Sequence, residues 1–387
     1  MKRYIAFFIT VLMILSFNTT VFAENNIKNE AETTFGEDFE VGSFVLMEAE
    51  TGKVLLSKNP TDSLAPASVT KILTLLIVAE ALSDGRIALT DKVTVSATAA
   101  SLGGSQVFLS EGEVLTVEEL IKCTVIASAN DAAVALAELI AGSEDAFVAM
   151  MNKRAAELGM TSTNFENATG LDDTVTNHVT SALDIAVMSR ELIKHDAILK
   201  YSSLWQDSIR GGEFVLTNTN RLVRFYDGCT GLKTGSTDKA GFCISTTAKR
   251  NGMHLIAVIM GAKTRDSRNE MARKLLDYGF AGYSLCAIPE MTVKEIPVSS
   301  GVKEKIMLYS SPAKLLIPKG SRSDIEKVFY LPDAIDAPQN AKESVGRIEY
   351  MLAGEKIGES QVYVNEDLEK VTFFGLFSLI FTSIFKA

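Results

Sequence analysis

Histidine is scarce in this chain of 387 residues, which contains only His178, His195 and His254. None of them stands in an H-E-x-x-H motif, so zinc peptidase chemistry has no support. No G-x-S-x-G motif occurs, which excludes the nucleophile elbow of the α/β-hydrolases. His195 lies near a predicted helix end and His254 in a predicted strand, and both are interpreted as surface or packing residues. A serine nucleophile in this chain is therefore not expected to use histidine as its base.

Cysteine is also scarce, and the four cysteines are not spaced as zinc ligands. Cys229 and Cys243 are candidates for neighbouring strands, where export would permit a disulfide, but small buried apolar residues are the favoured interpretation. Basic residues number 38 against 48 acidic ones, which gives a formal net charge of -10. Because phosphate binding needs a basic face, a nucleic-acid partner is disfavoured.

The most apolar segments lie at the two ends, and each is short for a helix that spans a membrane, which needs about 20 residues. Residues 1–23 combine basic Lys2 and Arg3 with an apolar stretch and a small residue, Ala23, before Glu24. This pattern predicts a secretory signal peptide cut after Ala23, and the alternative is an uncleaved anchor. Residues 24–40 are polar and acidic and predict a flexible leader.

Residues 366–387 predict an amphipathic helix at the other end. Apolar residues recur there at spacings of 3 and 4, which is a helical stripe: Phe373, Phe374, Phe377, Ile380, Phe381 and Ile384. We interpret this helix as one that lies in a membrane interface, and the alternative is packing on the protein's own core. The expected location is extracytoplasmic, tethered to the outer face of the cell membrane.

Between the ends, residues 43–59 predict a β-hairpin, and residues 64–82 predict an apolar helix. Residues 116–141 predict two helices separated by a break at Ser128-Ala129-Asn130, the first with a capping box from Thr116 to Glu119. A further helix is expected after Ser181, with Ser181 and Asp184 as its capping box. The predicted helices are expected to form an all-helical subdomain, inserted in the sequence between strands.

From residue 213 to residue 262 the pattern is that of short strands, joined at 249–252 by an Asn-Gly hairpin turn. The connections are too short for crossover helices, so these strands are expected to be antiparallel. A helix follows over residues 268–283. Residues 41–286 are therefore predicted to form one α+β domain, an antiparallel sheet flanked by helices with a helical subdomain. Residues 287–365, a series of short alternating strands, predict a small all-β domain.

Ser68 and Lys71 stand one helical turn apart at the start of the apolar helix. A desolvated lysine, or one near another cation, has a lowered pKa and acts as a base toward a serine hydroxyl. The positive end of the helix would favour an oxyanion at Ser68. On its own the S-x-x-K spacing is weak evidence for catalysis, because a capping serine and a surface lysine give the same pattern.

Two further motifs strengthen the interpretation of Ser68 and Lys71 as a catalytic pair. Ser128-Ala129-Asn130 supplies a hydroxyl and an amide at a helix break. Lys233-Thr234-Gly235 lies on a predicted strand and offers a cation, a hydroxyl and a glycine that permits close approach of a ligand backbone. Together, and in this order, the three motifs resemble those of the penicillin-recognising serine enzymes. Within them the chain resembles low-molecular-mass penicillin-binding proteins of the peptidase S11 type, from about residue 41 to the end.

The resemblance implies a β-lactamase/transpeptidase-like fold and a set of roles. Ser68 is the expected nucleophile and Lys71 its base, while Ser128 and Asn130 assist proton transfer and substrate positioning. The expected substrate-binding residues are Lys233, Thr234, Gly235, Ser236 and Arg268. The backbone N–H groups of Ser68 and Ser236 would form the oxyanion hole. Arg268 matches the family's arginine for the substrate carboxylate, with Arg265 as the competing choice.

The implied reaction is D-alanyl-D-alanine carboxypeptidase chemistry on peptidoglycan stem peptides, through an acyl-enzyme and without metal or cofactor. β-Lactams would acylate the same serine as inhibitors. One alternative is a class A-like β-lactamase, for which Glu166 is the candidate deacylating carboxylate. Another is a peptidoglycan-binding protein without catalysis.

Overall fold

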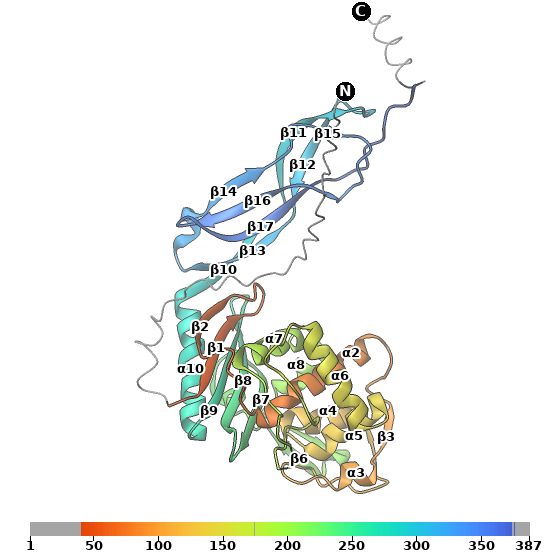
Figure 1. The fold of residues 1–387 in the computed structure, drawn as a ribbon, viewed down its shortest axis with the longest axis vertical. Helices are drawn as coiled ribbons and strands as arrows, with labels where there is room; N and C mark the ends of the chain where they lie inside the picture. Colours follow the sequence, from red (N-terminus) through yellow and green to blue (C-terminus); the bar gives the residue numbers. More distant parts are fainter. Residues whose placement is uncertain (1–39, 174, 374, 376–387) are drawn as a thin grey trace, which may run out of the picture.

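The computed structural model describes residues 40–173, 175–373 and 375, and it is elongated, with a larger lobe joined to a slender β lobe (Figure 1). The predicted signal peptide, all of the predicted leader except Glu40, and most of the predicted terminal helix lie outside the described residues. In the described part of the chain, no helix has both the length and the apolar character to cross a membrane.

A five-stranded antiparallel sheet, in the order β2-β1-β9-β8-β7, organises the larger lobe. Its strands are β1 (Ser43–Glu48), β2 (Val54–Lys58), β7 (Cys229–Thr237), β8 (Gly241–Arg250) and β9 (Met253–Ala262). Asn251 and Gly252 both have positive φ between β8 and β9, as a type I′ hairpin turn requires. The expected antiparallel strands and this hairpin are therefore confirmed, and β7 is left at the edge of the sheet.

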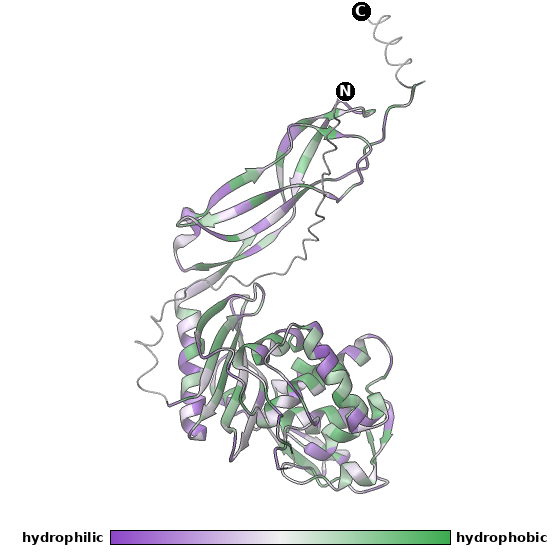
Figure 2. Cartoon of the chain, in the orientation of Figure 1, coloured by the Kyte–Doolittle hydropathy of each residue, from purple (hydrophilic) through white to green (hydrophobic). Residues whose placement is uncertain are grey.

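Alternation along the strands gives the sheet two buried faces. Val45 faces the helical core, whereas Leu46 faces a second core shared with α10 (Arg265–Gly282). Figure 1 shows α10 on one side of the sheet and the remaining large helices on the other, and Figure 2 shows apolar residues gathered where they meet. Those other helices are α2 (Lys71–Ser83), α4 (Val117–Ile126), α5 (Asn130–Ala141), α6 (Glu144–Glu157), α7 (Ala182–Leu192) and α8 (Asp196–Ser202).

Short elements complete the lobe. They are the 3₁₀ turns η1 (Ala67–Thr70) and η2 (Arg210–Gly212), the helices α3 (Ala97–Ala100) and α9 (Leu222–Phe225), and the strand pairs β3 (Lys92–Thr94) with β4 (Val114–Thr116) and β5 (Gln206–Ile209) with β6 (Phe214–Thr217). The strand expected near residue 214 therefore pairs in a separate ribbon rather than in the main sheet.

Helix starts follow the capping signals of the sequence. The capping box of Thr116 and Glu119 is confirmed at the start of α4. The Ser181 side chain likewise accepts from the Asp184 backbone N–H at the start of α7. The Asp184 carboxylate instead accepts from the Ser162 backbone and the Thr163 hydroxyl, so the second half of that capping box is replaced by a tertiary contact.

The slender lobe is all-β and has its own apolar core. Its main sheet has the order β14-β16-β17-β12-β11-β15, and β10 pairs with β13 beside it. The strands are β10 (Tyr283–Ile288), β11 (Met291–Ser299), β12 (Lys305–Ser310), β13 (Ala313–Pro318), β14 (Glu326–Tyr330), β15 (Ile335–Asp336), β16 (Ser344–Leu352) and β17 (Glu355–Val364), with the turn η3 (Ser321–Asp324). The predicted fold class is confirmed, whereas the boundaries at 286/287 and 365/366 remain predictions.

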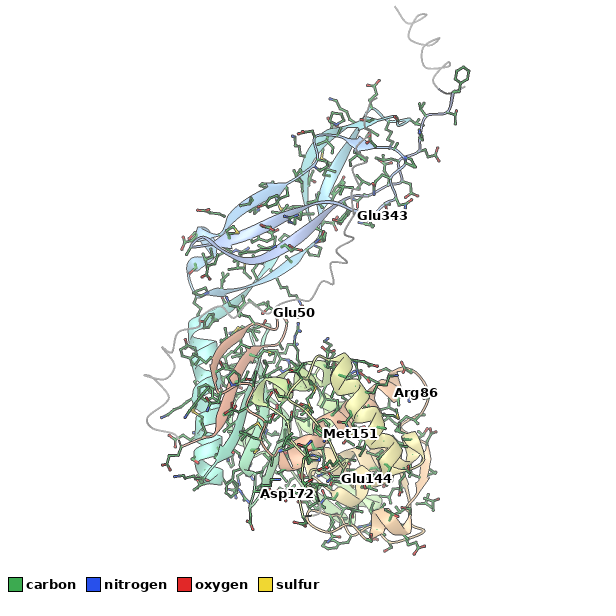
Figure 3. All side chains as sticks on the ribbon, viewed as in Figure 1. Glu50, Arg86, Glu144, Met151, Asp172 and Glu343 are labelled. Carbon is green, nitrogen blue, oxygen red and sulfur yellow. The ribbon has the colours of Figure 1, made fainter. Side chains whose placement is uncertain are left out.

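The lobes meet near Glu50, whose carboxylate lies 2.9 Å from Lys314 Nζ; Figure 3 shows Glu50 at this junction. All four cysteines are free thiols. Cys229 and Cys243 do lie on neighbouring strands, but the register places Cys229 opposite Ala248 and Cys243 opposite Gly235. A disulfide between them would need a shift of the whole ladder, so the buried-thiol interpretation holds.

Candidate active site

Ser68 lies in the 3₁₀ turn η1 rather than in an α-helix, and α2 begins only at Lys71. This differs from the continuous helix that the sequence predicts. In a 3₁₀ turn the side chains at i and i+3 eclipse one another, so the tighter turn brings the two groups into register. Lys71 Nζ lies 3.0 Å from Ser68 Oγ.

Lys71 is fully buried, and its amine has three neighbours. Besides Ser68, Nζ donates to Asn130 Oδ1 at 2.6 Å and to the Thr169 carbonyl at 2.8 Å. Burial lowers the pKa of Lys71 well below the usual lysine range, and the charge of Lys233 lowers it further, while the buried Asp131 carboxylate opposes both effects. A neutral Lys71 amine adjacent to a serine hydroxyl can accept that hydroxyl's proton.

The predicted break between α4 and α5 delivers Ser128 and Asn130 to the same place. Ser128 is buried with a φ of 64°, a conformation that costs energy for a residue with a side chain. Its hydroxyl has no hydrogen-bond partner among the described residues, and Ser128 lines the cavity at Ser68, so the hydroxyl is available to a ligand. Asn130 Nδ2 donates to the Gly103 carbonyl at 2.7 Å, which fixes its amide oxygen toward Lys71.

Strand β7 carries the third motif against the turn of Ser68. Lys233 is buried and its pKa falls to about 7, first through burial and then through repulsion by Arg268. A Cβ on Gly235 would lie 2.7 Å from Ser68 N and 2.9 Å from Pro66 O. The glycine therefore permits close approach of the protein's own turn η1, and not only of a ligand backbone as the sequence suggested. We call η1 the nucleophile turn because it carries Ser68, the predicted nucleophile.

A cavity of about 450 Å³ opens at Ser68, and Ser128, Thr234, Gly235 and Ser236 contribute to its wall. Other lining residues come from the β5–β6 region and from the first turn of α10: Trp205, Thr217, Asn218, Thr219, Arg221, Arg265 and Arg268, with Ser105 opposite. β7 is an edge strand of the sheet, and its residues Thr234, Gly235 and Ser236 border this cavity.

Arg268 and Arg265, the two candidates for binding the terminal carboxylate, both line the cavity, so they differ in burial and contacts rather than in position. Arg268 is buried, donates to Asn269 Oδ1 and to the Cys243 carbonyl, and has its pKa lowered to about 10 mainly by burial. Arg265 is exposed at the start of α10. Arg268 is the more rigidly held of the two.

The loop at 164–173 buttresses the nucleophile turn, a role that the sequence did not reveal. The Thr169 carbonyl accepts from Lys71, and the Ala168 carbonyl accepts from Thr74. A Cβ on Gly170 would lie only 1.8 Å from the Ala67 carbonyl oxygen, so only glycine fits there. The available signal was the segment "ENATGLDD", in which only Glu166 stood out from the sequence, as the candidate deacylating carboxylate.

His178 belongs to the same support. Its Nδ1 accepts from the Glu166 backbone N–H at 3.0 Å, so the proton resides on Nε2, 2.8 Å from Thr70 Oγ1. The Thr70 hydroxyl in turn donates to the Ala67 carbonyl at 2.9 Å. This relay requires a neutral imidazole, and burial lowers the pKa of His178 to about 4. The other two histidines pair elsewhere, His195 with Ser83 and His254 with Thr230.

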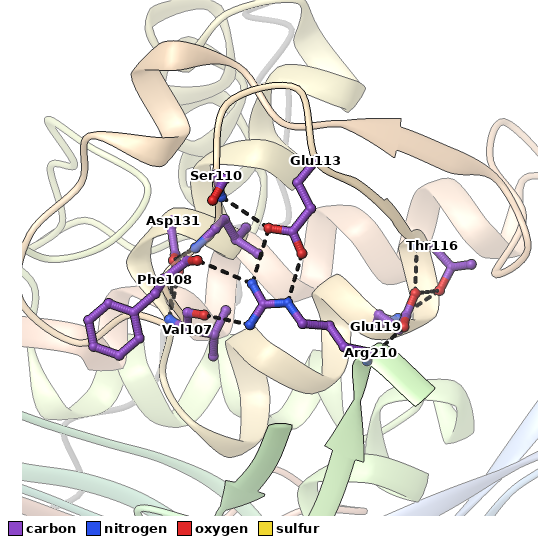
Figure 4. A network of polar contacts seen from close by, with 9 residues as sticks. Val107, Phe108, Ser110, Glu113, Thr116, Glu119, Asp131 and Arg210 are labelled. Atoms are coloured by element: carbon purple, nitrogen blue, oxygen red, sulfur yellow. Dashed lines mark hydrogen bonds and ion pairs between the residues drawn. The ribbon is translucent and has the colours of Figure 1, made fainter. Parts of the chain in front are cut away.

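A polar network around Arg210 holds the segment that carries Ser105, another residue of the cavity wall, and Figure 4 shows this network. The buried Asp131 carboxylate accepts from the backbone N–H groups of Val107 and Leu109. Arg210 donates to the carbonyls of Val107 and Phe108 and pairs with Glu113 at 2.7 Å. The segment that carries Ser105 into the cavity is thereby fixed from both sides.

Glu166, the carboxylate considered for a β-lactamase, is engaged in structure. Its Oε2 accepts from the Asn177 backbone N–H at 2.8 Å, and Glu166 does not line the cavity at Ser68. The geometry gives it no position from which to activate a water at the acyl group.

Family models and curated relatives match nearly the whole chain. Residues 28–264 match the peptidase S11 family, D-alanyl-D-alanine carboxypeptidase, and residues 290–370 match the C-terminal domain of penicillin-binding protein 5. The D-alanyl-D-alanine carboxypeptidase DacF of Bacillus subtilis is 42% identical over 380 residues, which is 96% of this chain and 96% of that protein. DacC of Escherichia coli is 33% identical over 355 residues, 89% of this chain and 88% of that protein.

Solved structures show the same relationship. Penicillin-binding protein 5 from Haemophilus influenzae superposes with a TM-score of 0.78 at 31% identity, covering 86% of this chain and 98% of that one. Coverage of this extent includes the all-β lobe as well as the lobe that carries Ser68. The chain therefore belongs to the D-alanyl-D-alanine carboxypeptidase family, peptidase family S11.

Proposed function

We propose that this protein is a serine-type D-alanyl-D-alanine carboxypeptidase that removes the terminal D-Ala from peptidoglycan stem peptides and is acylated by penicillin. The observation that carries the proposal is the buried Lys71 amine, held between Ser68 Oγ and the two carbonyl oxygens of Asn130 and Thr169.

Those two carbonyls define how Lys71 acts as the base. Each can only accept, so together they take up two N–H bonds of the amine. A neutral amine then has its lone pair left for the third direction, toward the Ser68 hydroxyl. Lys71 takes the Ser68 proton as Oγ attacks the carbonyl of the penultimate D-Ala, and the resulting ammonium donates to all three oxygens.

The attack places negative charge on the former carbonyl oxygen. The backbone N–H groups of Ser68 and Ser236 are our candidates for the oxyanion hole, because both residues line the cavity. Ser128 has an unpartnered hydroxyl and is proposed to pass a proton to the departing amine. The C–N bond then breaks, D-Ala leaves, and water hydrolyses the ester on Ser68.

Residues of β7 and α10 are proposed to orient the substrate. Arg268 and the Thr234 hydroxyl are proposed to bind the terminal carboxylate, with Lys233 supplying further positive charge. The free edge of β7 is proposed to pair with the peptide backbone of the substrate, with Gly235 keeping that edge close to Ser68.

Fluorescent penicillin and a D-Ala-D-Ala peptide test the proposal together. We expect a stable adduct that is lost in Ser68→Ala, and release of D-Ala from the peptide. Rapid turnover of the label would indicate a β-lactamase, and an absence of label would indicate a binding protein without catalysis. Failure to release D-Ala would overturn the carboxypeptidase assignment.

Export and membrane attachment are part of the proposal and rest on the sequence of the two ends. We propose cleavage after Ala23 and attachment of residues 366–387 to the outer face of the cell membrane. Fractionation of cells that express the whole chain, compared with a chain that stops at residue 365, tests the attachment. Equal recovery of both in the membrane fraction would refute it.

A further inference from the structure

Three arginines, which we call the arginine rim, line the cavity at Ser68 near enough to repel one another: Arg221, Arg265 and Arg268. They come from two places in the fold, since Arg221 immediately precedes α9 while the other two lie in the first turns of α10. Arg268 is buried, whereas Arg221 and Arg265 are exposed at the mouth. A single terminal carboxylate needs only one guanidinium, with which it forms two parallel hydrogen bonds.

The charge of the rim is balanced only in part by the protein, through the attraction of Asp266 for Arg268. Among the residues that the structure describes, none of the three arginines forms an ion pair with a carboxylate. Arg265 and Arg221 both repel Arg268 and help to lower its pKa, after the larger effect of burial. The chain as a whole is acidic, with a net charge of -10, so the rim is a local reversal of sign that attracts anions into the cleft.

Helix α10 adds to this positive charge. It has 18 residues, and its first turn carries Arg265 and lines the cavity. A helix N-terminus has a positive partial charge and favours acidic side chains, so an arginine at its first position is electrostatically unfavourable. Asp266 is the acidic residue of that turn. Arg265 does not follow this preference, and in proteins such exceptions are expected at functional sites.

We propose that Arg221 and Arg265 of the arginine rim form a subsite for a second anionic group of the substrate, carried by the leaving group in addition to its terminal carboxylate. This inference rests on the proposed carboxypeptidase function, in which Arg268 binds that terminal carboxylate. The side chain or onward chain of the leaving residue then lies beside Arg221 and Arg265. The favoured substrates are acyl-D-Ala peptides whose leaving residue is acidic, and the bond broken is the same amide.

Three synthetic substrates test this inference: diacetyl-Lys-D-Ala followed by D-Ala, D-Glu or D-Gln. D-Glu and D-Gln have the same shape and differ in charge, so their ratio of kcat/KM isolates the electrostatic effect. In the purified full chain at low salt we expect D-Glu to exceed D-Gln about fivefold, as partly exposed ion pairs allow. The double substitution Arg221→Ala with Arg265→Ala should bring that ratio close to one.

Arg273→Ala is the matched control, because Arg273 is an exposed arginine of the same helix that does not line the cavity. It should keep the D-Glu preference of the wild type. Equal rates for D-Glu and D-Gln in the wild type, with D-Ala still released from the first substrate, would overturn the subsite alone. A rim variant that slows both substrates equally would show general steering and would also overturn it. No hydrolysis of any of the three would overturn the proposed function as well.

Discussion

At the scale of single residues, the site depends on amines that are kept out of water. Lys71 and Lys233 are both buried, and burial is the largest cause of the lowered pKa of each. The lysine of an S-x-x-K motif thus becomes a base through its surroundings, namely burial away from water and the nearby charge of Lys233, rather than through its spacing from the serine.

The pH dependence of acylation follows from Lys71. A base with a lowered pKa is already deprotonated at pH values where an ordinary lysine is charged, so acylation should stop rising well below pH 10.5. The measurement is the second-order rate constant of penicillin acylation between pH 5 and pH 10, on protein that remains folded. A rate that climbs tenfold per pH unit up to pH 10 would contradict this role.

Replacement of Gly235 is expected to slow acylation. In Gly235→Ala the added methyl group would meet Ser68 N at 2.7 Å, so β7 or the nucleophile turn must move. Because the Ser68 N–H is a proposed oxyanion donor, we expect acylation by penicillin to slow by about 100-fold or more.

Gly282→Ala is the control for that substitution, since Gly282 has open space around its Cβ position. Its acylation rate should stay near that of the wild type. If Gly235→Ala is acylated as fast as Gly282→Ala, the close approach at Gly235 has no part in the chemistry.

At the scale of elements, the nucleophile turn η1 is held by a loop about 100 residues away in sequence. The loop at 164–173 supplies carbonyls to Lys71 and Thr74, and His178 continues the support through Thr70. The sequence predicted neither connection, because nothing in a local pattern reports which distant carbonyl an amine will find.

The relay at His178 predicts how stability depends on pH. The pKa of His178 is about 4 in the folded protein and about 6.5 when unfolded, so the unfolded chain binds an extra proton between these values. This contribution to stability is present above pH 6.5 and is lost as the pH falls toward 4, by about 3 kcal/mol.

The substitution His178→Gln should therefore cost less free energy of unfolding at pH 4 than at pH 7. Urea unfolding at both pH values measures the difference. His195→Gln is the control, because His195 is only partly buried and pairs with Ser83 instead. The same cost of His178→Gln at both pH values would show that the imidazole is not held neutral.

At the scale of the whole molecule, the two lobes have separate apolar cores. The core of the β lobe runs from Cys286 to Leu368, while the helical core of the larger lobe contains no described residue beyond Met260. The core on the α10 side of the sheet includes Leu316 of the β lobe, and Tyr283 and Leu285 of β10 pack against it. The lobes thus share apolar surface only on the α10 side of the sheet, and Ser68 lies in the larger lobe.

Residues 41–288 alone should therefore fold and react with penicillin at a rate within about twofold of the full chain, since each lobe is large enough to bury its own core. Stopping at 288 keeps β10 whole. Acylation kinetics and thermal unfolding of both proteins provide the test. A fragment that folds but acylates much more slowly would mean that the β lobe supports the site.

The sequence by itself determined the features that depend on neighbours along the chain. The Asn251-Gly252 hairpin, the Thr116 cap and the i, i+3 spacing of Ser68 and Lys71 are of this kind, and so is the order of the three motifs. Tertiary packing, by contrast, places Gly235 against the turn of Ser68, keeps Glu166 out of the cavity lining, and brings Arg221 into the same cavity as Arg265. Each of these depends on packing between segments far apart in sequence, which residue spacing does not report.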